Sequence, residues 1–130
     1  MANTDNMHSF IASGTITEFA LVAVDSDGKV EVVADPTSEA AVGIAQRAVV
    51  AGEAVDVIIG GLTRAIAGAE IAPETTSLLM ADTAGVLIPF VKGSGNFSVA
   101  RVIPNINHAS PAANDQIKVM FTGPSNYKSA

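Results

Sequence analysis

Two stretches of the sequence decide the fold. Residues 21–28 read LVAVDSDG and residues 78–85 read LLMADTAG, a separation of 57 positions (78 − 21 = 57). Each is a short apolar run followed by an acid and a glycine, the composition of a tight β-hairpin turn, because glycine adopts the positive φ angles that such a turn requires. The residues predicted to form the two turns are Asp25, Gly28, Asp82 and Gly85.

The similarity extends beyond the hairpins. Residues 55–61 align with residues 117–123 at a separation of 62 (117 − 55 = 62). The five additional residues (62 − 57 = 5) fall within 104–114, a polar loop where an insertion costs little. The order and the spacing together predict two duplicated β units, with pseudo-repeats at about 14–68 and 69–123.

The remaining chain consists of short β-rich runs separated by glycine, aspartate, asparagine and proline. Such breaks at short intervals are typical of all-β proteins. We expect an all-β fold, a compact β-barrel or sandwich, with residues 1–12 as a flexible N-terminal arm and residues 124–130 as a loose C-terminal tail. Residues 13–123 would form a single β domain with at most one short helix, near residues 107–114.

The balance of charge restricts the classes of partner. The 130 residues carry a net charge of −6 at pH 7, and the seven Lys and Arg residues stand singly along the chain. Nucleic acids and anionic membranes bind clustered cations, so we expect neither as a partner. Charged residues make up 15% of the chain, and the mean hydropathy is +0.39. This composition indicates that an oligomer or another protein covers part of the surface.

The motifs of common catalytic, metal and cofactor sites are incomplete in this sequence. Cysteine is absent, which excludes thiolate chemistry and cysteine-bound zinc. The acidic run at 25–28 would need Gly and Glu at the sixth and twelfth positions of a calcium loop, where Val30 and Pro36 stand. The glycines at 93–95 precede a strand-like run, whereas a dinucleotide site needs a helix there. We therefore expect no enzyme activity, metal, cofactor or small-molecule substrate.

Three other patterns fit an enzyme or a carrier poorly. His108, Ser110 and Asp115 are near one another in the sequence, but they belong to a polar loop, and a catalytic triad is defined by geometry. The Gly-Ser pair at 93–94 is the kind of bond that pyruvoyl-dependent decarboxylases cleave, but it falls in a loop late in the chain. Lys118 stands in mid-strand, whereas lipoyl and biotinyl carriers hold their modified lysine at a hairpin tip.

Five short motifs follow one another in the first part of the chain. They are Gly14-Thr15-Ile16 and the runs at 21–30 (LVAVDSDGKV), 41–45 (AVGIA), 51–57 (AGEAVDV) and 61–68 (GLTRAIAG). In this order they resemble the head decoration (capsid cement) proteins of tailed bacteriophages. The resemblance covers roughly residues 10–90 and fades over 91–130.

The resemblance implies a structural protein on the outer capsid surface of a virion. Such proteins form homotrimers and stabilise the shell by bridging neighbouring major capsid proteins, which would be the partner here. One alternative is a β-rich fibre or spike adhesion module, for which the aromatic fraction of 5% is low. A further alternative is a small β-barrel enzyme.

The N-terminal arm is the candidate for attachment to the capsid. It is polar but ends in residues that could order on a shell by adding a strand to a sheet edge. The residues expected to make this contact are Met7, His8, Phe10 and Ile11. A terminus that is disordered and has no role is the alternative.

Overall fold

Buried and exposed side chains alternate along the strands of this protein. In β5 (Ala54–Ile58), Val55 and Val57 are buried, whereas Ala54 and Asp56 between them are exposed. Successive side chains of a strand point to opposite faces of its sheet, so this alternation gives one core face and one outer face. The computed structural model describes residues 6–34, 41–71, 78–91, 97–103 and 111–125.

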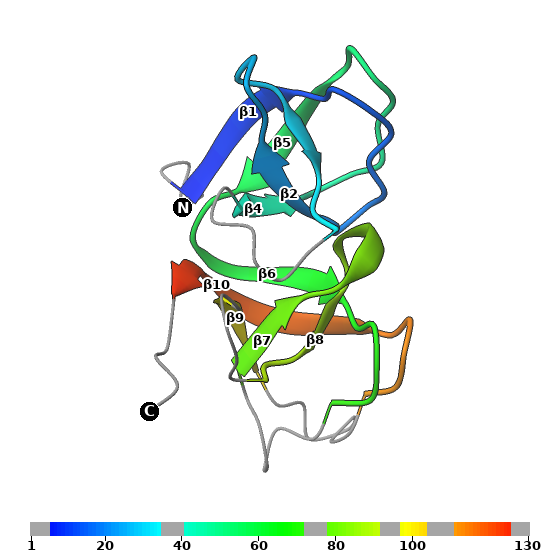
Figure 1. Ribbon diagram of the computed structural model, residues 1–130, viewed down its shortest axis with the longest axis vertical. Helices are drawn as coiled ribbons and strands as arrows, with labels where there is room; N and C mark the ends of the chain where they lie inside the picture. Colours follow the sequence, from blue (N-terminus) through cyan, green and yellow to red (C-terminus); the bar gives the residue numbers. More distant parts are fainter. Residues whose placement is uncertain (1–5, 35–40, 72–77, 92–96, 104–110, 126–130) are drawn as a thin grey trace.

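Within these residues, ten strands form two antiparallel sheets of five, which together make a β sandwich (Figure 1). The first sheet has the order β1-β5-β4-β2-β3. Besides β5, it contains β1 (Met7–Ile11), β2 (Leu21–Val24), β3 (Val30–Val32) and β4 (Ala41–Ala45). The second sheet has the order β6-β10-β9-β7-β8. It contains β6 (Gly61–Ile66), β7 (Leu78–Ala81), β8 (Leu87–Pro89), β9 (Ser98–Val102) and β10 (Gln116–Ser125).

The second sheet repeats the first, strand for strand, as the duplication predicts. Each strand number in its order is five higher than in the order of the first sheet. The β2–β4 ladder shifts register after Val22, and the β7–β9 ladder shifts after Leu79, 57 positions later (79 − 22 = 57). Loop bonds repeat as well: the N–H of Ile16 donates to the carbonyl of Val49 and that of Ile71 to the carbonyl of Pro111, both at 2.9 Å.

The units begin earlier than the sequence suggested. We expected pseudo-repeats at 14–68 and 69–123, which assigns β6 to the first unit. In the structure β6 pairs with β10 of the second sheet, and β1 occupies the equivalent place beside β5. We therefore define unit 1 as residues 6–58 and unit 2 as residues 61–125.

Three expectations about irregular segments need correction. Met7–Ile11 is not part of a flexible arm, because it is hydrogen-bonded to β5 as an edge strand. Residues 111–114 of the expected helix form a turn instead, with Asn114 at φ 74°; residues 104–110 lie outside the described residues. The tail does not begin at residue 124, because β10 continues to Ser125. A short 3-10 turn, η2 (Thr83–Gly85), lies between β7 and β8.

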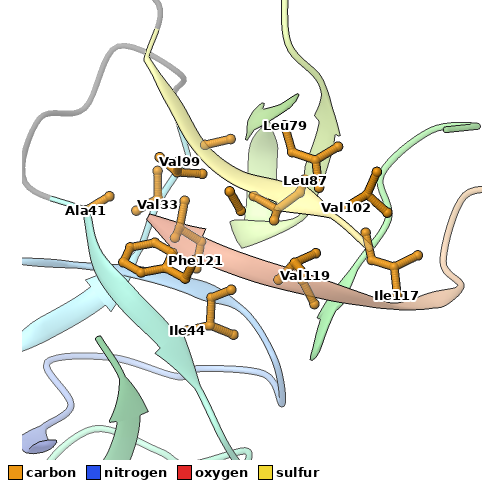
Figure 2. Close-up of a cluster of buried hydrophobic side chains, with 14 of the residues drawn as sticks. Val33, Ala41, Ile44, Leu79, Leu87, Val99, Val102, Ile117, Val119 and Phe121 are labelled. Carbon is orange, nitrogen blue, oxygen red and sulfur yellow. The ribbon is translucent and has the colours of Figure 1, made fainter. Parts of the chain in front are cut away.

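The buried side chains of the described residues form two clusters. The smaller cluster lies within unit 1 and includes Val22, Val30, Val55 and Val57. The larger one contains the equivalent core of unit 2 together with Leu21, Val33 and Ile44 from unit 1. Figure 2 shows Phe121 of β10 beside Ile44 and Val33, so that this aromatic ring connects the two sheets.

Candidate interaction surfaces

The turn between β2 and β3 is held by the side chain of Asp25. Its Oδ1 accepts hydrogen bonds from the backbone N–H of Asp27 at 2.8 Å and of Lys29 at 3.0 Å. Desolvation raises the pKa of Asp25, but these bonds, the Ser13 hydroxyl and the Lys29 charge outweigh it, so the pKa is lowered. Gly28 takes the positive φ of 79° that closes the turn. These contacts are those of a turn-forming aspartate.

The equivalent turn of unit 2 makes a contact that the first turn lacks. Gly85, at φ 77°, is buried, and its N–H donates to the carbonyl of Val33 in unit 1 at 2.8 Å. Asp82 starts this turn, where its N–H donates to the carbonyl of Val86 at 2.9 Å. Gly28 is exposed instead. The hairpin tip of unit 2 is thus part of the contact between the units, and the tip of unit 1 faces solvent.

The four residues expected to contact a capsid all lie in β1. Met7 and Ile11 are exposed, at 43% and 42%, on one face of the strand. His8 and Phe10 lie on the other face, with ring centroids 4.7 Å apart in an edge-on arrangement. Phe10 packs against the core of unit 1. The structure therefore separates these residues into an outer apolar pair and a pair on the opposite face, where Phe10 is half-buried and His8 is exposed.

The outer face of the second sheet carries three cations. Arg64 of β6 and Lys118 of β10 are directly opposite one another in the ladder, and Arg101 of β9 is opposite Met120. Leu62 lies opposite Met120 on the other side. Leu62 and Met120 are 53% and 40% exposed, and all three cations are exposed. We call these five residues the cationic face.

The strands around the cationic face do not supply a countercharge. None of the five strands of the second sheet contains an acid. Arg64 donates a hydrogen bond to Oε1 of Gln116 at 3.3 Å. A shallow hollow of about 290 Å³ opens beside this pair and is lined by Arg64, Gln116, Ile117 and Lys118. Two cations and an amide around an open hollow suit an incoming carboxylate.

Sequence reasoning missed this face, because its three cations stand singly at positions 64, 101 and 118. They converge only through the pairing of β6 and β9 with β10. The signal that could have revealed them is the alternation in β6 and β10, which places Arg64 and Lys118 on the outer face. To predict that Arg64 and Lys118 lie opposite one another, the register of the β6–β10 ladder must also be known.

Other sites considered from the sequence gain no support. Within the described ranges, no group of three or more His, Asp or Glu side chains could hold a metal ion. His108, Ser110 and the glycines at 93 and 95 lie outside those ranges. Lys118 is the third of the ten residues of β10 and therefore does not stand at a hairpin tip. No helix of the described chain is long and apolar enough to cross a membrane.

The fold is shared with a solved bacteriophage protein. That structure is the N base of the head fiber protein gp8.5 of bacteriophage phi29, with a TM-score of 0.65. The likeness covers 93% of this chain and 99% of the phage chain, at 17% sequence identity. No protein-family model matches the sequence, and no curated protein matches it either. At this level of identity the comparison establishes the two-sheet fold over nearly the whole of both chains.

Proposed function

We propose that the chain is a structural, non-catalytic component of a phage head. The observation that carries the proposal is the match to the N base of a head fiber, which extends over 93% of one chain and 99% of the other. Because the match covers nearly all of both chains, the likeness extends to the whole architecture and is not limited to one common motif. The order of the five sequence motifs, which resembles head decoration proteins, supports the same role independently.

In this role the protein binds the outer surface of the capsid as a homotrimer and stabilises the shell by bridging major capsid proteins. Each trimer would contact several capsid subunits at once, so that contacts of modest strength add up to firm attachment. Met7 and Ile11 on β1, together with the cationic face of unit 2, supply exposed apolar and charged groups for contacts between the copies of the trimer. Met7, His8, Phe10 and Ile11 would then act as part of an ordered strand rather than as an arm.

The base of a projecting head fibre is the second candidate, and the same match favours it, because the phage chain is itself the N base of a head fiber. In that role the protein would attach a longer fibre to the head. The two roles differ in what lies on the side of the protein that faces away from the capsid. This side faces solvent in a cement protein, and it carries the rest of the fibre in a fibre base.

Electron cryomicroscopy of native phage particles that contain this protein tests both roles. We expect density matching the two-sheet body on the outer shell, between neighbouring capsid subunits. Particles that lack the protein should release their DNA at a lower temperature than complete particles. Density at the foot of a fibre would favour the second candidate, and particles with no such density on the head would contradict the proposal.

A further inference from the structure

The cationic face is costly for the isolated protein. Arg64 and Lys118 are cross-strand partners, and like charges directly opposite in a ladder destabilise it. The strands beside them in the second sheet contain no acid that could neutralise these charges. Leu62 and Met120 add exposed apolar surface beside the charges. An acidic, partly apolar partner would neutralise the cations and cover the apolar side chains together.

Unit 1 of the same protein has the matching chemistry. Residues 6–58 contain eight acids and two cations, a net charge of −6 (2 − 8 = −6). Residues 61–125 contain four of each, a net charge of zero. The whole net charge of the chain is thus carried by unit 1, while three exposed cations gather on one face of unit 2.

The duplication places an acid where the cationic face has a lysine. Asp56 of β5 is equivalent to Lys118 of β10 (118 − 56 = 62), and both are exposed in mid-strand. Opposite Asp56 in the ladder is Ser9, where unit 2 has Arg64 (64 − 9 = 55). Met7 and Ile11, both exposed, lie on the same face as Asp56. We call Met7, Ser9, Ile11 and Asp56 the acidic face.

We propose that the cationic face of unit 2 binds the acidic face of unit 1 in a second copy of this chain. The carboxylate of Asp56 would lie between Arg64 and Lys118, and the apolar side chains of the two faces would pack around this charged centre. The inference deepens the proposed function, because it rests on the homo-oligomer proposed there and identifies its interface.

The charge pattern also determines the symmetry of this contact. A two-fold contact through the cationic face would bring Arg64 and Lys118 against their own copies, and the like charges would repel. Contact between two different faces is heterologous, and it closes into a ring when the rotation between copies permits. A ring of three copies is the trimer of the proposed function.

Charge reversal, followed by light scattering and sedimentation of the full-length protein, tests this interface. We expect the parent protein to have the mass of a closed oligomer. The double variant Arg64→Glu/Lys118→Glu and the single variant Asp56→Lys should each weaken assembly about tenfold or more, since each places like charges together. Combining all three substitutions reverses both faces, and the oligomer should form again.

Two controls separate the specific contact from a general effect of charge. Asp27→Lys makes the same charge change as Asp56→Lys, but at the exposed tip of the β2–β3 hairpin, and it should leave assembly unchanged. Raising NaCl from about 0.1 M to about 1 M reduces the Debye length from about 10 Å to about 3 Å, and it should weaken the parent oligomer. Circular dichroism and urea unfolding should show that every variant remains folded.

Several results would overturn the inference. These are a parent protein that stays monomeric at every concentration, a triple variant that does not reassemble, and an Asp27→Lys variant that dissociates as Asp56→Lys does. Reversed cations that leave the oligomer intact but abolish binding to particles would assign the cationic face to the capsid instead. The proposed function would fail with a different result. In that case the oligomer would respond to the charge reversals as expected, but it would never bind phage particles.

Discussion

Two glycines with the same backbone conformation have different roles in this protein. Gly28 and Gly85 close equivalent hairpins at φ 79° and φ 77°. A Cβ added at Gly28 would meet no atom within 4 Å, whereas one at Gly85 would lie 2.9 Å from the Cβ of Ala20 and 3.0 Å from the carbonyl oxygen of Leu21. Gly28 is thus needed only for the turn, and Gly85 is needed also for close contact between the units.

Substitution by alanine should distinguish these two roles. Gly28→Ala places a side chain in the left-handed region and should lower the free energy of unfolding by about 1 kcal/mol. Gly85→Ala adds a collision with unit 1 to the same strain and should cost about 2–4 kcal/mol. Urea denaturation of both variants measures the difference. Equal losses would show that the contact between η2 and unit 1 contributes nothing beyond the turn.

At the scale of elements, the edge strand β1 shows where sequence reasoning stops. The five-residue run MHSFI follows a polar stretch, and most of its side chains are exposed, so its composition resembles that of an arm. Its place in the sheet depends on hydrogen bonds with β5, which is more than forty residues away in the chain. By contrast, β5 was predictable, because its alternation of apolar and polar residues indicates a strand that is buried on one face.

The two faces of β1 should respond differently to truncation. Phe10 is half-buried against the core of unit 1, and Phe10→Ala should cost about 1–3 kcal/mol of unfolding free energy. Ile11→Ala removes a side chain that is 42% exposed and should cost less than about 1 kcal/mol. Thermal and urea unfolding of both variants provide the test. A Phe10→Ala protein as stable as its parent would show that β1 does not stabilise the sheet.

At the scale of the whole molecule, we expect the two units to unfold together, because the larger buried cluster contains side chains from both of them. Phe121 is 3% exposed and packs between the sheets, so Phe121→Ala should cost about 3–5 kcal/mol. Its neighbour Met120 is 40% exposed, and Met120→Ala should cost less than about 1 kcal/mol. Hydrogen exchange should show amides of both units losing protection in Phe121→Ala. Loss confined to unit 2 would mean that the units unfold independently.

The duplication was predictable from the sequence, but the contact between its copies was not. A constant spacing links Leu21 to Leu78, and it survives because both hairpins keep the same turn chemistry. Nothing along the chain distinguishes Gly85, which contacts unit 1, from Gly28, which contacts solvent. The cationic face was hidden for the same reason, because Arg64, Arg101 and Lys118 meet only after three strands have paired.

The link between the units consists of residues 59–60, between the end of β5 and the start of β6. Two separate copies of one unit would have to find each other in solution, and dilution would then separate them by mass action. The two-residue link converts this encounter into an intramolecular one with a high effective concentration. The contact that Gly85 and Phe121 make with unit 1 therefore persists however few copies of the protein are present.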